Sequence, residues 1–278
     1  MTQPSISAFL PLLAKDIDRA DILLRSLRYF PQPLRSLSIA CRDGDLAPAE
    51  ALARRHPELK IVVATEASIL GPRLAALKGL APRWARDRQQ MLLKLWAAAS
   101  SESPLLLTLD ADVVLTRRLR VADVGLVGKP PLVAFAPVQH PAWYEASARL
   151  LRLPVPMQEM GVTPAILRRD VTRQLLESLD LMLPSSAGAR LNLTRRTWTE
   201  YALYYTWLAG TGQSQDYHRT VRYADWFGPS VWYAEDWPAW RFPTPKSPVD
   251  APFCVIQSSA QVPCEAIVER IRQELPDF

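Results

Sequence analysis

The stretch Leu105-Leu106-Leu107-Thr108-Leu109-Asp110-Ala111-Asp112-Val113-Val114-Leu115 decides the interpretation of this chain. Its first five residues are almost entirely apolar, which is typical of a strand buried on both faces of a sheet. Two carboxylates, two residues apart, follow where this strand ends. In open α/β sheets, ligands bind at the carboxyl ends of the strands. The stretch therefore predicts a buried strand that leads to a ligand site at Asp110 and Asp112.

The sequence on both sides of this stretch, up to about residue 137, predicts an alternation of strands and helices. Short apolar runs ended by turn residues predict strands, and apolar residues repeated at helical spacing predict helices. We expect strands over residues 6–13, 37–41 and 59–65, helices over 17–27, 47–55 and 86–100, and a fifth strand over 131–137. This order predicts an α/β fold, with a mostly parallel, Rossmann-like central sheet flanked by helices.

Beyond residue 140 the sequence changes in character. Thr163 as N-cap and Pro164 at the first position predict a helix over 165–183. We also expect a helix over 199–208, a strand over 253–258 and a helix over 263–275. Fourteen of the 24 aromatic residues lie between Trp198 and Phe242. With no repeat and no low-complexity linker, we expect a single domain over 1–278, with one lobe over about 5–137 and a second over 138–278.

The composition excludes several classes of protein. The chain has 278 residues, of which 49% are hydrophobic and 22% charged, which is typical of a water-soluble globular protein. Its longest apolar runs are far shorter than the ~18–20 residues of a membrane span. Residues 1–7 lack the basic and apolar regions of a signal peptide. We expect no transmembrane segment and a cytoplasmic location. The cysteines, Cys41, Cys254 and Cys264, form no C-x-x-C pair, so the sequence encodes neither a disulfide framework nor a thiolate zinc site.

The chain carries a basic excess that consists mostly of arginine. Its formal net charge is +5, and of its 33 basic residues 27 are arginine. Arginine forms two-pronged contacts with phosphate, so anionic ligands or acidic lipid head groups are expected partners. The same excess also follows from GC-rich coding. No run of five basic residues occurs, and we expect no nucleic-acid partner.

The paired aspartates suggest metal chemistry. Hard divalent cations such as Mg²⁺ and Mn²⁺ prefer oxygen ligands. Held by Asp110 and Asp112, such a cation would neutralise the charge of a departing phosphate or diphosphate. A D-x-D pair by itself is common, and its alternative interpretation is a solvated turn. Its position after three strand-helix units and a strongly apolar strand favours the ligand site.

With these residues, the chain resembles the glycosyltransferases of the GT-A fold, the nucleotide-diphospho-sugar transferases, and among them a bacterial branch of unassigned function. Four places carry the resemblance: the first strand leading to Lys15-Asp16, the helix with Arg88-Gln89-Gln90 and Lys94-Leu95, the Leu109-Asp110-Ala111-Asp112 box, and Trp198-Thr199-Glu200-Tyr201. It implies transfer of a hexose-like sugar from a nucleotide-diphosphate donor to a glycan or lipid-linked acceptor, in bacterial surface polysaccharide synthesis.

The resemblance also implies roles for individual residues. Asp110, Ala111 and Asp112 would form the donor box, and the two aspartates would hold Mn²⁺ or Mg²⁺, which makes Asp112 part of the catalytic machinery. Lys15 and Asp16 would meet the nucleoside, and Gln90 and Lys94 would lie close to the donor phosphates. Relatives often supply a third metal ligand from the C-terminal part, and this ligand stays open among His218, Gln257 and Ser258.

Glu200 has two interpretations. Inverting sugar transfer needs a carboxylate that takes the proton of the acceptor hydroxyl, and in GT-A enzymes this base often begins a helix of the acceptor half, as Glu200 does. Thr197-x-x-Glu200 is also a capping box, in which the carboxylate only satisfies a backbone amide. Asp225, Glu235 and Asp236 are the reserve candidates for the base.

The aromatic residues of the second lobe have three interpretations. Their rings pack against the C–H faces of sugars, they form the core, or some enter a membrane surface and place the protein peripherally at the inner membrane. The residues in question are Trp198, Tyr201, Trp226, Trp232, Trp237 and Trp240.

Two other functions fit parts of the sequence. Leu109-Asp110-Ala111-Asp112-Val113 matches the box of haloacid-dehalogenase-type phosphohydrolases, in which the first aspartate is a nucleophile. In those enzymes the box lies near the chain start, whereas 109 residues precede Asp110 here. The aromatic cluster alone fits a non-catalytic carbohydrate-binding protein.

Overall fold

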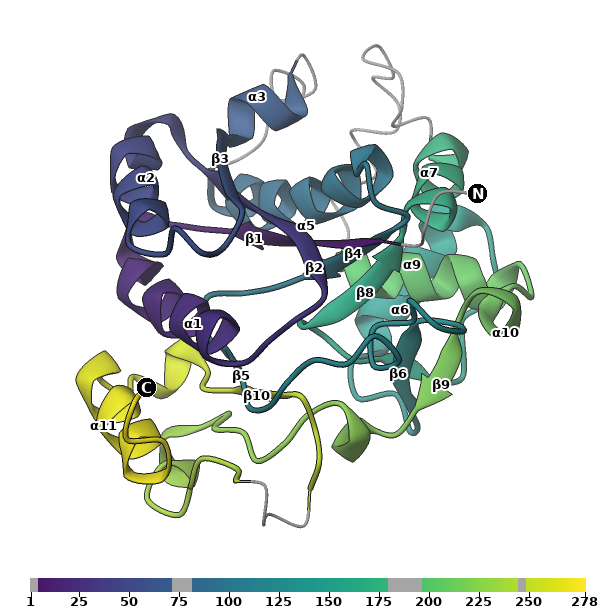
Figure 1. Ribbon diagram of the computed structural model, residues 1–278. Coiled ribbons are helices and arrows are strands. Elements are labelled where there is room, and N and C mark those ends of the chain that lie inside the picture. The colour runs from purple at the N-terminus through teal and green to yellow at the C-terminus, as the bar shows by residue number, and fades with distance from the viewer. Residues whose placement is uncertain (1–4, 72–81, 180–196, 245–248) are drawn as a thin grey trace.

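The computed structural model describes residues 5–71, 82–179, 197–244 and 249–278, and the side chains of 82–88 are not described. Within these residues the main sheet has the strand order β3-β2-β1-β4-β8 (Figure 1). β1 (Ile6–Pro11), β2 (Leu34–Cys41), β3 (Ile61–Thr65) and β4 (Leu105–Thr108) are parallel. β8 (Ala165–Arg168) is antiparallel to β4. The central sheet is therefore mostly parallel, as predicted.

Helices cover both faces of this sheet. On one face are α1 (Ile17–Tyr29) and α2 (Leu46–Arg54), and on the other α5 (Pro82–Ser100), α7 (Arg169–Ser178) and α9 (Glu200–Gly210). Alternate residues of β4 enter the two cores, since Leu105 and Leu107 pack with α1 and α2 while Leu106 packs with α5 and α9. This double burial explains the continuous apolar run of β4, and it confirms the predicted α/β fold class.

Two smaller sheets extend the main one. β5 (Val113–Leu115), which directly follows the Asp box, pairs antiparallel with β10 (Phe253–Val255). β6 (Pro131–Phe135) lies between β7 (Glu159–Met160) and β9 (Arg219–Val221). The strand predicted over 131–137 thus exists but belongs to a separate three-stranded sheet, and β5 was not predicted.

The helix predicted over 165–183 is wrong in its first turn. Ala165–Arg168 is strand β8, and helix α7 begins at Arg169. Ala165, Ile166 and Leu167 are buried beside β4, and this pairing determines the strand. Thr163 and Pro164 therefore precede a strand and do not cap a helix. Residues 180–183 lie outside the described part of the chain.

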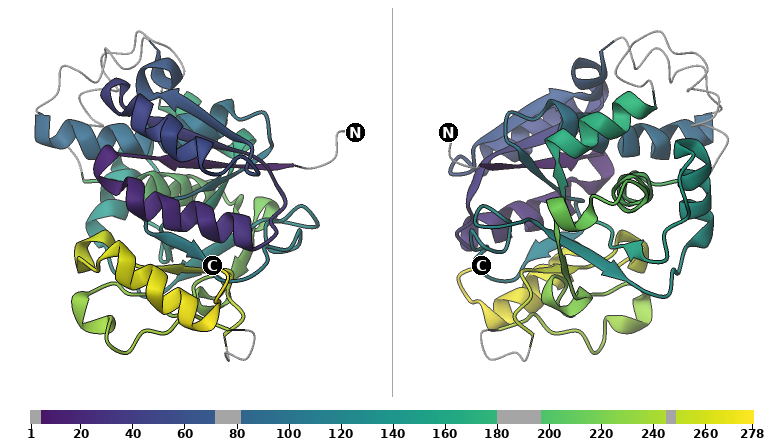
Figure 2. Two further views of the ribbon diagram at one scale, coloured as in Figure 1. Left: turned by 60° about the vertical axis from the view of Figure 1, so that its left-hand side comes forward. Right: turned by 90° about the vertical axis from the view of Figure 1, so that its right-hand side faces the viewer.

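The other predicted elements are confirmed, with ends that differ by a few residues. The remaining helices are α3 (Glu66–Leu70), α6 (Pro141–Leu151), α10 (Ser214–Tyr217) and α11 (Cys264–Glu274). Figure 2 shows α11 beside α1, and Ile267 and Ile271 of α11 pack in one cluster with Ile22 of α1. No helix in the described ranges has the length and apolar character of a membrane span.

A buried histidine between α9 and β9 makes the stability depend on pH. His218 is 2% exposed, and its Nε2 lies 2.8 Å from the hydroxyl of Tyr204. Burial, together with the charge of Arg168, lowers the pKa of His218 to about 4. Because the unfolded chain takes up this proton at a higher pH than the folded protein, acid favours unfolding.

We expect His218 to reduce the free energy of unfolding by about 3 kcal/mol as the pH falls from about 6.5 to 4. Urea unfolding of the wild type and of His218→Gln over this range measures the effect. The variant should lose less stability in acid, while the difference between the two proteins stays constant above about pH 7. Parallel pH profiles for the two proteins would contradict the assignment.

Candidate active site

Three elements meet at a buried lysine beneath the Asp box. Asp110 follows β4, Lys94 lies on α5, and Glu200 is the first residue of α9. Lys94 Nζ is 2.9 Å from Asp110 Oδ1 and 3.0 Å from Glu200 Oε1. Lys94 and Glu200 are both 4% exposed. One ammonium group thus lies between two carboxylates that are 90 residues apart in the sequence.

A chain of hydroxyl groups holds this lysine in place. Lys94 Nζ donates to Thr163 Oγ1 at 3.1 Å, and Thr163 Oγ1 lies 2.6 Å from the hydroxyl of Tyr201. The Tyr201 hydroxyl also lies 2.9 Å from Thr108 Oγ1, which donates to the carbonyl of Ala165. Every polar atom named here has a partner, as a buried network requires.

The charge of Lys94 is stabilised by its neighbours. Burial alone would lower the pKa of Lys94, but Asp110 and Glu200 outweigh it and raise this pKa well above its ordinary value. Lys94 is therefore charged at neutral pH. A buried charge of this kind is tolerated only because it is paired and hydrogen-bonded.

Asp112 occupies a less compensated position than Asp110. Its carboxylate accepts a 3.4 Å hydrogen bond from the backbone N–H of Ser258, and its carbonyl accepts one from Ile256. Burial and the nearby charge of Asp110 raise the pKa of Asp112 to about 6, against the opposing influence of Ser258 and Arg19. The site thus favours a cation or proton beside Asp112.

These residues fit a divalent metal ion. Asp110 and Asp112 supply hard oxygen ligands, and burial, together with the charge of Asp110, raises the pKa of Asp112, so that a cation beside it would stabilise its ionised form. The described residues contain no group of three His, Cys, Asp or Glu side chains that could hold a metal. Mg²⁺ is commonly bound by one or two carboxylates and completed by substrate phosphates and water. Asp110 and Asp112 alone are therefore enough protein ligands for a Mg²⁺ ion of this kind.

Helix α9 is capped by Thr199, so the predicted capping box at Thr197 is wrong. Thr199 Oγ1 accepts a 3.0 Å hydrogen bond from the N–H of Ala202, and Glu200 is the first helical residue. The carboxylate of Glu200 is therefore free of capping and pairs with Lys94.

This assignment predicts different effects for two neighbouring threonines. Thr199→Ala should reduce the free energy of unfolding by about 1 kcal/mol, because the Ala202 amide loses its acceptor. Thr197→Ala, at an exposed position, should change it by less than about 0.5 kcal/mol. Denaturant unfolding of both variants measures the difference. A larger loss of stability in Thr197→Ala than in Thr199→Ala would mean that Thr197 caps the helix.

The structure places the predicted donor-binding residues unevenly. Lys15 and Asp16 lie just beyond the carboxyl end of β1, and since β1 and β4 are parallel neighbours this is the edge that carries Asp110. Ala111 lies between the two aspartates and is half-buried, and Gln90 is exposed on α5. Contact of these residues with a donor stays a prediction. The side chain of Arg88 lies outside the described part.

Several other candidates take part in different contacts. His218 is bonded to Tyr204, which is not part of the Lys94 network. Asp225 pairs with Arg222 at 2.6 Å, and Asp236 accepts hydrogen bonds from the N–H groups of Trp232 and Tyr233. Ser258, one of the three candidates for the third metal ligand, contacts Asp112 by donating its backbone N–H to the carboxylate.

Most of the aromatic residues singled out in the second lobe belong to the core. Trp198, Tyr201, Trp226 and Trp240 are each at most 4% exposed, so their rings are not available to a sugar. Trp232 and Trp237 are half-buried, and Trp237 stacks on Trp240. These two are the members of the set that could contact a ligand in this conformation.

The sequence did not indicate the supports of the site. Thr108 and Thr163 join the network through their hydroxyls, and Arg19 donates to the carbonyls of Ile256 and Val262 beside Asp112. Arg19 lies on the polar side of α1, where it has the appearance of a surface residue. Only the pairing of β8 with β4 brings Thr163 to Lys94.

Comparison with known proteins identifies the family and the fold. The family described as "Family of unknown function (DUF6492)" matches residues 3–277. The chain belongs to this family. No curated protein matches the sequence at a significant level.

Among solved structures, the chain is similar to the crystal structure of mouse xyloside xylosyltransferase 1 in its apo form. The TM-score is 0.54 at 14% identity, over 93% of this chain and 99% of that chain. The apo structure of the WbbM bifunctional glycosyltransferase matches 84% of this chain and 41% of its own, with a TM-score of 0.47 and 9% identity. The first likeness confirms the predicted glycosyltransferase-type fold of this DUF6492 member.

Proposed function

We propose that this protein is a glycosyltransferase that takes a sugar from a nucleotide-diphosphate donor. The observation that carries the proposal is the arrangement at the carboxyl end of β4, where Lys94 pairs with both Asp110 and Glu200 and where Asp112 follows two residues after Asp110. The fold shared with mouse xyloside xylosyltransferase 1 supports it. Fold likeness alone does not fix an activity, so the site carries the argument.

Asp110 and Asp112 are the residues that would hold Mn²⁺ or Mg²⁺, and the ion would neutralise the diphosphate as it leaves. Lys94 fixes the orientation of the Asp110 carboxylate by pairing with its Oδ1 atom. The backbone N–H of Ser258 orients Asp112. Arg19, which is tied to two carbonyls of the C-terminal segment, adds positive charge near Asp112. Lys15, Asp16 and Gln90 complete the proposed donor site.

Glu200 is our candidate for the base of an inverting transfer. Its Oε1 is held by Lys94 at 3.0 Å, which leaves Oε2 as the atom that would accept the proton of the acceptor hydroxyl. Glu200→Gln keeps the shape but cannot accept a proton. It should bind donor as the wild type does and lose at least about 100-fold in transfer rate. An unchanged transfer rate would remove Glu200 from this role.

The acceptor is proposed to be a glycan or a lipid-linked glycan of the bacterial surface, used at the inner face of the membrane. Val155 and Met157, between α6 and β7, are 50% and 90% exposed. Apolar side chains exposed in this way support contact with a lipid or a sugar face. They lie in the half of the chain that also supplies Glu200.

Calorimetric titration tests the proposed function directly. Wild-type protein is titrated with UDP, GDP and CMP, each with Mn²⁺ and with EDTA. We expect one nucleotide to bind in a saturable manner with Mn²⁺ and at least about tenfold more weakly without it. Thermal shift with the same panel gives an independent readout. Absence of binding by all three nucleotides, with and without metal, would overturn the proposal.

A further inference from the structure

A second polar site lies at the other end of the β5–β10 pair. Asp112 precedes β5 and Arg117 follows it, so the two are separated by a three-residue strand, ~10 Å in length. A cleft of about 500 Å³ opens there, between the segment after β5, the segment that begins with β9, and Asp250. This volume is in the range of small-ligand sites.

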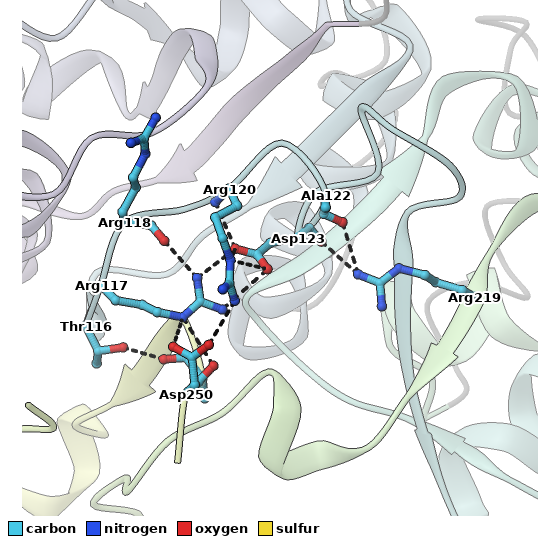
Figure 3. A network of polar contacts seen from close by, with 9 residues as sticks. Thr116, Arg117, Arg118, Arg120, Ala122, Asp123, Arg219 and Asp250 are labelled. Carbon is cyan, nitrogen blue, oxygen red and sulfur yellow. Dashed lines mark hydrogen bonds and ion pairs between the residues drawn. The ribbon is translucent and has the colours of Figure 1, made fainter. Parts of the chain in front are cut away.

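The floor of the cleft is a network of two arginines and two aspartates, drawn in Figure 3. Arg117 bonds Asp123 at 2.7 Å and Asp250 at 2.7 Å, and Arg120 bonds the same two carboxylates. Hydrogen bonds from Arg117 and Arg120 outweigh the effect of burial and lower the pKa of Asp123. Arg117 and Asp123 are both largely buried. The two positive and two negative charges of the floor balance, and Arg117 and Asp123 form its more buried pair.

The wall of the cleft carries cations that are not balanced in this way. The guanidinium of Arg219, on β9, donates to the carbonyls of Ala122 (3.1 Å) and Asp123 (3.4 Å), and it forms no ion pair with a carboxylate among the described residues. Arg222 pairs with Asp225, but the two side chains are 84% and 44% exposed. An exposed pair of this kind is worth little and is readily exchanged for another anion.

The charges of the lining fit an anionic ligand. Among the described residues, four arginines and three aspartates line the cleft, and Arg219 is the arginine of these four that has no ion pair within this set. Val221, Ala224 and Val249 supply an apolar side. Arginine binds phosphate through two parallel N–H···O bonds, and Arg219 keeps the donors for such a contact.

We propose that this cleft binds a phosphoryl group between Arg219 and Arg222, at a site separate from Asp110 and Asp112. Asp123, whose carboxylate pairs with Arg117 and Arg120, also presents a carbonyl to Arg219. On binding, Arg222 would release Asp225 and pair with the ligand instead. The phosphoryl group belongs to a free phosphate, a sugar phosphate or a phospholipid head group. The site goes beyond the proposed transfer reaction and does not depend on it.

The test uses the whole protein in EDTA at constant ionic strength. Orthophosphate, glucose 1-phosphate and vesicles of phosphatidylglycerol are titrated separately, with phosphatidylcholine vesicles as the reference. We expect saturable binding of orthophosphate that weakens about tenfold or more in Arg219→Ala/Arg222→Ala. Arg149→Ala, an exposed arginine on α6 that pairs with Glu145, is the matched control and should bind as the wild type does.

The three ligands show which kind of molecule carries the phosphoryl group that the cleft binds. Arginine-dependent binding of phosphatidylglycerol vesicles assigns the site to a lipid head group, and tighter binding of glucose 1-phosphate than of orthophosphate assigns it to a sugar phosphate. Asp110→Asn/Asp112→Asn should bind all three ligands unchanged, because it alters the other site. Equal binding by the wild type and the double arginine variant, or no binding of any ligand, would overturn the proposal.

Discussion

Replacing both aspartates of the Asp box with asparagine should abolish metal-dependent nucleotide binding, and the protein should still fold because Lys94 keeps its ion pair with Glu200. Asp110→Asn/Asp112→Asn keeps the shape of both side chains but removes both charges. Even the outer partners of metal ligands are worth ~10–100-fold in affinity, so we expect the double variant to lose at least about 100-fold in affinity for Mn²⁺. Titration with Mn²⁺, followed by its paramagnetic resonance signal, measures this without any substrate.

The single variant Asp112→Asn separates a binding defect from unfolding. Because the folded protein raises the pKa of Asp112 to about 6, the ionised carboxylate opposes folding above that pH. Without metal, Asp112→Asn should be more stable than the wild type at about pH 8, and this gain should disappear below about pH 4. A variant that binds less metal and is also less stable at pH 8 would contradict this account.

Removing the buried ammonium should have the largest effect on stability. Lys94→Met leaves Glu200 buried without its partner and Asp110 without its anchor. Breaking a buried ion pair in this way costs roughly 3–5 kcal/mol. The midpoint of urea unfolding measures the loss. Lys60→Met, at an exposed lysine without an ion pair in the described part of the chain, is the control and should change stability by less than about 0.5 kcal/mol.

A second substitution keeps this prediction testable if Lys94→Met folds poorly. Adding Glu200→Gln removes the uncompensated charge, so Lys94→Met/Glu200→Gln should recover a large part of the lost stability. The two substitutions should therefore couple strongly in a double-mutant cycle. Additive losses would mean that the Lys94–Glu200 contact does not stabilise the fold.

The sequence was most informative where a segment is buried on both faces or has a strong helical period. The apolar run of β4 and the periodic residues of α1, α5 and α11 were assigned correctly, because burial dictates their composition. The Asp box was found because a polar pair directly follows such a strand. These features are local, so a single sequence reveals them.

The errors have physical causes. Ala165-Ile166-Leu167 is a short apolar run that fits a strand or a helix, and its partner β4 lies about 60 residues earlier, so nothing local decides between them. Thr197 and Thr199 both precede Glu200, and only the backbone geometry selects the cap. Lys94 was expected near the donor phosphates, but the convergence of Asp110, Glu200 and Thr163 on its ammonium depends on contacts between segments far apart in the chain.

Slow hydrolysis of the sugar donor tests the central claim most directly, because it needs no acceptor. Wild-type protein is incubated with a panel of nucleotide-diphosphate sugars and Mn²⁺, and the released nucleoside diphosphate is quantified. We predict release from one donor class, which stops with EDTA and is absent in Asp110→Asn/Asp112→Asn. Release that persists in this double variant, or no release from any donor, would contradict a sugar-transfer site at the end of β4.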